Sequence, residues 1–105
     1  MYLKLRNFMK TVTTAGTREA LTTSNIRCPA LMLQAEASNT GSVYVGDSAV
    51  SSSLYAVDLN PGDVVSLTAA DFGMAGADIS LKDIWMDVGT STDGVAVSYV
   101  LREDE

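Results

Sequence analysis

Residues 39–63, NTGSVYVGDSAVSSSLYAVDLNPGD, decide the fold class of this chain. Within them Val43 and Val45 alternate with Tyr44, which is the period-two pattern of a strand with one face turned to a core. Turn residues stand on both sides of such runs. In the turn at 60–63, proline presets φ at the second position and glycine accepts the positive φ that a type II turn requires at the third. The stretch therefore predicts short strands joined by tight turns.

Alternation of this kind recurs along the whole chain. We expect strands at residues 2–12, 19–22, 27–35, 42–46, 55–59, 64–68, 84–88 and 95–101, with a loop or one helical turn at 69–77. Short strands spaced about 8 to 12 residues apart are typical of an antiparallel sandwich or small barrel. The prediction is an all-β protein: a single antiparallel β-sandwich, jelly-roll-like, of seven or eight short strands.

Side chains on one face of each expected strand should form the core. The predicted core positions are Leu31, Leu33, Val43, Val45, Val57, Val65, Leu67, Ile84 and Val97. The connections at 36–41 and 60–63 are short enough to close hairpins between the strands on either side. Pro29, near the start of the 27–35 strand, cannot donate a backbone hydrogen bond, which predicts an edge strand there.

The length of 105 residues allows one domain with one core. Hydrophobic residues make up 47% of the chain, which predicts a globular protein, and no apolar run approaches the roughly 18 residues of a membrane span. Residues 1–10 are interpreted as an N-terminal arm or a first strand, and residues 11–105 as the β-sandwich domain. The N-terminus lacks the continuous apolar segment of a signal peptide, so we expect use without secretory export.

Charge is distributed unevenly along the sequence. The net charge of −6 argues against nucleic acid as a partner, because phosphate binding needs a basic face. Residues 1–28 hold five basic residues against one acid, a balance of +4, whereas residues 29–105 hold two against twelve, a balance of −10. One interpretation is chance partition in a short chain; the other is a basic segment that pairs with an acidic surface of another copy or of a partner. The residues expected to make that contact are Tyr2, Leu3, Lys4, Leu5, Arg6, Phe8 and Lys10.

Groups suited to catalysis are few. The chain has no histidine and a single cysteine, Cys28, so Ser-His and Cys-His nucleophile pairs and cysteine metal clusters are excluded. Asp78, Asp83 and Asp87 could place two carboxylates on one strand face, where a solvated face is expected rather than a glycosidase-like pair. We therefore expect no enzymatic activity.

Sites for cofactors and metals are not expected either. Calcium could use Asp47, Asp58 or Asp93 with loop carbonyls, but these residues do not stand in the Asp-x-Asp-x-Asp-Gly spacing of a calcium loop. Cys28, which precedes Pro29, is expected to be a small buried hydrophobe rather than a reactive thiol.

Sugar binding is an alternative function that the residues leave open. Carbohydrate sites use exposed aromatic side chains, and the candidates here are Tyr44, Tyr55, Trp85 and Tyr99. All four fall within expected strands, where packing in the core or on a sheet face is the default.

Three segments together resemble the small all-β structural proteins of tailed-bacteriophage virions. The segments are VTTAGTREAL at 12–21, the 39–63 stretch with its Asn-Thr-Gly-x-Val-Tyr-Val-Gly and Leu-x-Pro-Gly-Asp patterns, and DISLKDIWMD at 78–87 followed by GVAVSYV at 94–100. The resemblance covers most of residues 11–101, and residues 1–10 lie outside it. It implies a compact β-sandwich that decorates the capsid exterior as a cement protein, or that forms part of a head fibre or tail.

A capsid decoration protein of this kind would bind the major capsid protein or another virion protein. The resemblance implies a homotrimer on the capsid exterior, assembled in the host cytoplasm, with neither a membrane nor nucleic acid as partner. Oligomerisation would also cover the edge strands that a small sandwich leaves open. The alternative is a head-fibre or tail component, or a carbohydrate-binding adhesion module.

Overall fold

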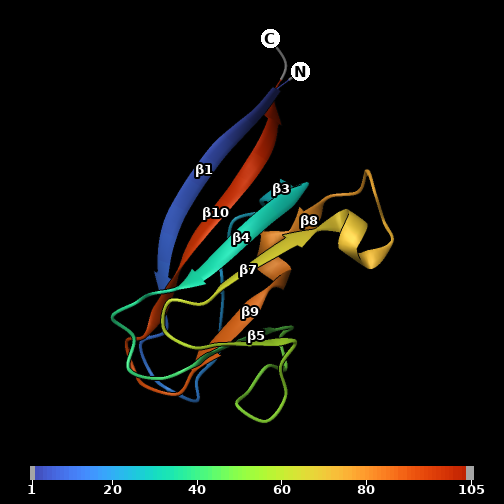
Figure 1. Ribbon diagram of the computed structural model, residues 1–105. Coiled ribbons are helices and arrows are strands. Elements are labelled where there is room, and N and C mark those ends of the chain that lie inside the picture. The colour runs from blue at the N-terminus through green and yellow to red at the C-terminus, as the bar shows by residue number, and fades with distance from the viewer. Residues whose placement is uncertain (1, 104–105) are drawn as a thin grey trace.

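Strands form nearly all of the regular structure in the computed structural model, which describes residues 2–103 (Figure 1). Within this range there are ten strands: β1 (Tyr2–Thr11), β2 (Glu19–Ala20), β3 (Arg27–Cys28), β4 (Ala30–Ala35), β5 (Val43–Gly46), β6 (Val57–Leu59), β7 (Val64–Thr68), β8 (Ile79–Ser80), β9 (Trp85–Val88) and β10 (Gly94–Glu103). Two 3₁₀ turns are η1 (Ala69–Phe72) and η2 (Leu81–Asp83). Met1, Asp104 and Glu105, which fall within the expected arm and domain, lie outside the described residues.

The strands pair in a nested, antiparallel order. β1 pairs with β10, β2 with β9, β3 with β8, β4 with β7 and β5 with β6. The pairs β10–β4 and β9–β5 join these ladders into two four-stranded sheets. Sheet A has the order β1-β10-β4-β7, sheet B has the order β2-β9-β5-β6, and β3 with β8 forms a separate two-stranded piece. The expected all-β antiparallel class is confirmed. No helix within residues 2–103 is long and apolar enough to cross a membrane.

Strands that follow one another in the chain rarely pair. The sequence predicts hairpins at 36–41 and 60–63, but β4 and β5 lie in different sheets, as do β6 and β7. The prediction is wrong because turn residues determine the local bend and not the sheet that the next strand joins. The turn at 60–63 itself forms as expected: Gly62 has a φ of +86°, and the Asp63 N–H donates to the Asn60 carbonyl at 2.9 Å.

Pro29 divides the single strand expected at 27–35 into β3 and β4. The predicted edge position is wrong, since β4 lies between β10 and β7 within sheet A. The missing N–H falls in the break before β4 begins, where it interrupts no ladder. Arg27 and Cys28 pair with β8 instead of continuing along sheet A. This break and the two-residue strand β8 explain why the described chain has more strands than the seven or eight expected.

One hydrophobic cluster draws on both sheets, and the predicted core positions all belong to it or pack against it. Leu31, Leu33, Val43, Val45 and Val97 are buried, and Val57, Val65, Leu67 and Ile84 are partly buried. The buried members that the alternation did not single out include the loop residues Val12 and Leu21. Cys28 is fully buried, as expected, and this burial raises the pKa of its thiol, with a smaller contribution from the Asp78 carboxylate.

A polar junction marks the start of β10. The Asn39 side chain donates to the Gly94 carbonyl at 2.8 Å and accepts from the Gly94 N–H at 3.0 Å. The Asp93 carboxylate accepts from two backbone N–H groups of the β4–β5 connection, at 3.1 and 2.8 Å. The Asp93 carbonyl accepts from the Val12 N–H, just beyond β1, at 3.1 Å. Asn39 and Asp93 are both buried, so these bonds replace the water that their polar groups lose on folding.

Gly94→Ala should destabilise the fold. A Cβ at residue 94 would lie 2.4 Å from the carbonyl oxygen of Lys10, a backbone atom of the paired strand that cannot swing aside. Overpacking of this kind costs about 1–3 kcal/mol, which should appear as a lower urea midpoint of unfolding. Gly89→Ala is the control, because its Cβ would meet no atom closer than 3.8 Å. Equal midpoints for the two variants would contradict the close approach of β10 to β1.

Candidate interaction surface

Sheet A has two unequal open edges. β1 at one edge is ten residues long, and β7 at the other is five. An edge strand leaves alternate backbone N–H and C=O groups without a partner in the sheet, so a long exposed edge is a site of association. The edge strands of sheet B, β2 and β6, have only two and three residues. β1 is therefore the longest open edge in the described part of the chain.

β1 holds all seven residues predicted to bind a partner and distributes them over both faces of sheet A. Phe8 lies opposite the buried Val97, which identifies the face turned toward the core. Leu3, Leu5 and Met9 lie on the other, outer face and are 60%, 68% and 58% exposed. The core-side members are Tyr2, Lys4, Arg6, Phe8 and Lys10.

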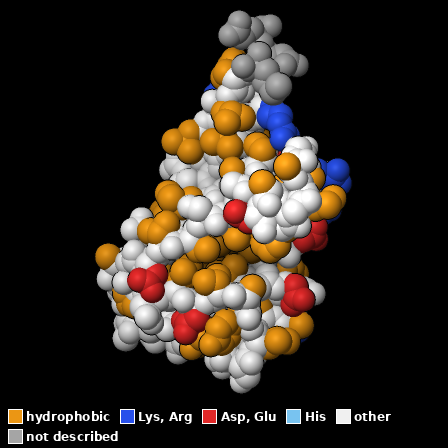
Figure 2. Space-filling model, turned by 45° about the vertical axis from the view of Figure 1, so that its right-hand side comes forward, with side chains coloured by type: hydrophobic (Ala, Val, Ile, Leu, Met, Phe, Trp, Pro, Cys, Tyr) orange, Lys and Arg blue, Asp and Glu red, His pale blue; other side chains and the backbone are white. Residues whose placement is uncertain are grey.

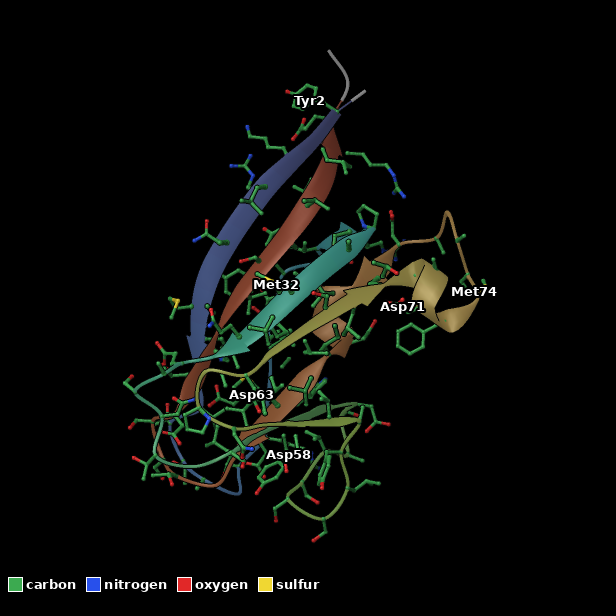
Figure 3. The ribbon with its side chains drawn as sticks, in the orientation of Figure 1. Tyr2, Met32, Asp58, Asp63, Asp71 and Met74 are labelled. Atoms are coloured by element: carbon green, nitrogen blue, oxygen red, sulfur yellow. The ribbon has the colours of Figure 1, made fainter. Side chains whose placement is uncertain are left out.

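The outer face of sheet A is apolar around Leu5. Leu5 lies opposite Val100 of β10, which lies opposite Ala30 of β4. These residues and Met32 line a shallow groove of about 250 Å³. Met32 is exposed and lies on β4, inside the sheet rather than at its edge (Figure 3). The apolar surface therefore extends from the β1 edge across the sheet.

The core-side residues at the end of β1 anchor it to the sandwich. Phe8 is half-buried and packs edge-on against Tyr99, with ring centroids 6.1 Å apart. The Lys10 ammonium donates to the Glu19 carboxylate at 2.9 Å, which ties β1 in sheet A to β2 in sheet B. This half of β1 is therefore part of the folded domain.

Residues 2–4 of β1 project with residues 101–103 of β10 beyond the end of β4 (Figure 1). Residues 2–7 are exposed on both faces. Lys4 and Arg6 carry their positive charges here, and Figure 2 shows basic side chains toward this end of the molecule and acidic ones toward the other. The basic segment is thus a fully paired strand whose first three residues extend past the neighbouring strand β4.

The β7 edge differs from β1 in charge and shape. Asp63 precedes the strand and Asp71 follows it in η1, so that carboxylates flank both ends of β7 (Figure 3). A groove of about 450 Å³ opens beside β7, lined by apolar side chains that include Leu67 and Phe72, and also by Asp83. The β7 edge therefore combines an apolar hollow with acidic groups.

The three carboxylates considered for catalysis have different surroundings. Asp83 is exposed and Asp78 is bonded to Arg102. Asp87 is buried and accepts from the Gly16 N–H at 3.0 Å and from the next backbone N–H at 2.8 Å. The expected solvated face is wrong for Asp87, because its carboxylate fastens the turn before β2 onto β9. Within residues 2–103 no group of three or more cysteine, aspartate or glutamate side chains is arranged to hold a metal ion.

Tyr55 is not in a strand, contrary to the sequence prediction. It precedes β6, is 46% exposed, and lies against Tyr44 with ring centroids 5.3 Å apart. Trp85 and Tyr99 lie in strands and are partly buried. Of the four candidates, Tyr55 is therefore the one whose ring is exposed to a sugar, with Tyr44 packed beside it.

The residues predicted to bind a partner did not include Met32 and Val64 on the outer face, or the acidic residues at the β7 edge. Alternation in 30–35 does turn Met32 away from the core, so this residue carried a signal. Alternation in 64–68 likewise turns Val64 away from the predicted core positions Val65 and Leu67. Asp63 carried no signal, because nothing local indicates that β7 is an edge strand.

Glu19→Gln should lower stability by an amount that vanishes in acid. The hydrogen bond from Lys10, followed by that from the Thr13 N–H, lowers the pKa of the Glu19 carboxyl from 4.5. A carboxyl with a lowered folded-state pKa stabilises the fold above its unfolded pKa, and this contribution is lost as pH falls through the folded-state value. The pair should contribute at most about 1 kcal/mol, measured as a lower urea midpoint for the variant at pH 7.

The same comparison in a Lys10→Met background is the control. Without the ammonium, Glu19→Gln should have little effect at either pH. The assignment of this stability to the Lys10–Glu19 pair would be contradicted by one result. That result is a midpoint difference between wild type and Glu19→Gln that persists unchanged at a pH below the folded-state pKa of Glu19.

The described residues thus place a basic, apolar edge and an acidic, grooved edge on opposite sides of one sheet. Neither β1 nor β7 has a second partner strand within residues 2–103. No protein-family model, curated protein or solved structure matches the chain.

Proposed function

We propose that this chain is a non-enzymatic structural protein of a bacteriophage virion, a capsid decoration (cement) protein that attaches to the capsid exterior through β1. The observation that carries the proposal is the exposure of Leu3, Leu5 and Met9 on a ten-residue edge strand. Exposed apolar side chains on a sheet face form an association site, and they stay on that face if the backbone edge of β1 is itself paired. A capsid surface would be the partner that covers them.

Apolar burial would supply most of the affinity. Fully burying a leucine or methionine side chain is worth about 1.5–3 kcal/mol, whereas an exposed ion pair contributes about 0–1 kcal/mol. Leu3, Leu5 and Met9 would therefore hold the chain in place. Lys4 and Arg6 would govern orientation and association rate against an acidic surface of the major capsid protein or another virion protein.

Several copies acting together would strengthen the attachment. A second contact made by a linked assembly benefits from a high effective concentration. Closed symmetric oligomers are the usual form of such assemblies, and we propose a homotrimer. Its location would be the virion exterior, after assembly in the host cytoplasm.

The strand order supports the same assignment. Nested pairing in two four-stranded sheets is what results when one long antiparallel hairpin is rolled up, and we infer a jelly roll from it. Jelly rolls occur in viral capsid proteins and in lectins. The resemblance of residues 12–21, 39–63, 78–87 and 94–100 to phage virion proteins adds a second line of support.

Replacing Leu3 and Leu5 by serine should leave a folded domain that attaches poorly to capsids. The two side chains are exposed, so the fold loses little, whereas the capsid contact loses its apolar area. The measurement is the number of copies per purified particle, by quantitative mass spectrometry, after the variant is added to particles that lack the chain. At least about a tenfold loss of affinity is expected, since 1.4 kcal/mol corresponds to a factor of ten.

Leu54→Ser is the matched control, because Leu54 is 60% exposed and lies outside β1. It should attach as the wild type does. Undiminished attachment of the Leu3→Ser/Leu5→Ser variant, with circular dichroism showing an intact fold, would refute attachment through β1.

A carbohydrate-binding module on a head fibre or tail is the second candidate. The exposed Tyr55, packed on Tyr44, is the observation that favours it, because sugars stack on accessible aromatic rings. A glycan array separates the two functions. The adhesion module would be favoured over the cement protein if the chain binds a defined glycan, if Tyr55→Ala abolishes this binding, and if Leu3→Ser/Leu5→Ser preserves it.

A further inference from the structure

We propose that the two open edges of sheet A pair with each other between copies, β1 of one copy beside β7 of the next, and that the copies close into a head-to-tail ring. This interface rests on the proposed function only in the expectation that copies of the chain associate with one another. Its formation does not require a capsid. Each copy contributes one β1 and one β7. A closed ring would therefore leave neither edge of sheet A open.

The number of strands in sheet A makes the new pairing antiparallel. Every neighbouring pair in the order β1-β10-β4-β7 is antiparallel. Four strands of alternating direction leave the two edges running opposite ways. A second copy rotated about an axis along the strands presents its β7 antiparallel to β1, so the sheet continues from copy to copy with the same pattern.

The strand registers place the two edges at the same level. Followed from strand to strand across the sheet, Leu5 is level with Thr68, and Met9 is level with Val64. A neighbouring copy related by rotation, without a shift along the strands, keeps these levels. Three residues of β1 then meet three of the neighbouring β7: Leu5 with Thr68, Asn7 with Ser66, and Met9 with Val64.

The unpaired backbone groups fall on these same residues. The Val12 N–H donates to the Asp93 carbonyl, so residue 12 faces β10, and alternation turns residues 5, 7 and 9 away from it. The Ala35 N–H donates to the Asp63 carbonyl, so residue 63 faces β4, and residues 64, 66 and 68 turn away. The Thr68 N–H already donates to the Asp71 carboxylate at 2.9 Å, so the Leu5 carbonyl finds no free donor in this alignment. The other N–H and C=O groups of these six residues oppose one another.

Side-chain charge is complementary in this alignment. Lys10, whose ammonium is paired with Glu19 of its own copy, comes level with Asp63 of the neighbouring copy, at the end where β7 begins. Arg6 comes level with Leu67, which lines the groove that also holds Asp83. The basic core-side face of β1 would thus meet the acidic, apolar hollow beside β7.

Pairing of β1 with itself about a two-fold axis fits less well. Centred on Asn7, it would place Lys4 opposite Lys10 of the partner copy. Centred on Arg6, it would place Arg6 opposite itself. Like charges directly opposite each other destabilise a strand pair, so the charges favour the head-to-tail arrangement.

A pair of engineered cysteines tests the interface. The substitutions Asn7→Cys and Ser66→Cys in one chain put thiols at two exposed positions that meet only between copies. Within one copy these positions are three strand spacings apart, roughly 14 Å, whereas a disulfide needs Cα atoms within about 7 Å. The native Cys28 is buried. Mild oxidation of the double variant should give disulfide-linked oligomers that end at one closed size, expected to be three copies, on a non-reducing gel.

The single variants are the controls and should stay uncross-linked. A covalent dimer from Asn7→Cys alone would overturn the head-to-tail arrangement in favour of β1 pairing with itself. Absence of cross-linked species from the double variant would overturn the interface. A ladder of bands without an upper limit would overturn ring closure.

Charge reversal gives an independent measurement. Arg6→Glu and Asp83→Arg should each weaken the oligomer in sedimentation experiments, by up to about fivefold in dissociation constant, the equivalent of one exposed ion pair. The two substitutions together should restore it, and failure to restore would refute the contact. Rings that do not attach to capsids would refute the proposed function and support this interface. Monomers that attach to capsids would refute this interface and support attachment through β1.

Discussion

The polar junction at the start of β10 is the contact on which the registers of β10 with β1 and with β4 depend. Asn39 holds the N–H and the carbonyl of Gly94, and the Asp93 carboxylate binds the β4–β5 connection. Gly94 lies so close to the backbone of Lys10 that no side chain fits between them. Because β10 pairs with β1 on one side and with β4 on the other, a shift at this junction would move both neighbours.

Nested pairing explains why the surface of interest lies where it does. The β1–β10 ladder runs for ten residues, but β2, the edge strand of sheet B that Lys10 and Glu19 tie to β1, has only two. The core-side face at the start of β1 consequently has no second layer over it, which leaves Lys4 and Arg6 exposed, while Leu3 and Leu5 lie on the outer face. At the other edge of sheet A, β7 is followed by η1, and the groove beside it exposes Leu67 and Phe72. The same topology therefore produces a projecting basic strand and an acidic recess on one molecule.

Much of the fold was predictable because strand alternation and turn chemistry are local. Alternation found core positions such as Leu33 and Val97, and the glycine requirement found the turn at Gly62. Of the candidate surface, the sequence indicated the basic, apolar segment at residues 2–10 from its charge imbalance. Alternation also placed Leu3 and Leu5 on the face opposite Lys4 and Arg6. It did not indicate which of the two faces is turned to the core, since the buried face of a strand is known only when its partner is known.

The sequence by itself determined the all-β class, most strand positions, part of the core and the position of the basic segment, because each follows from residues within a few positions of one another. Only the tertiary structure decided which strands are edges, because that depends on the sheet that each strand joins. Pro29 illustrates the limit: its missing N–H suggested an edge, yet a break in the chain lets β4 occupy the interior of sheet A. Asp87 is a second residue whose environment the sequence did not indicate. Its carboxylate is buried and accepts a hydrogen bond from Gly16, which is distant in sequence. The acidic β7 edge, likewise, became a candidate partner for β1 only when three strand registers were combined.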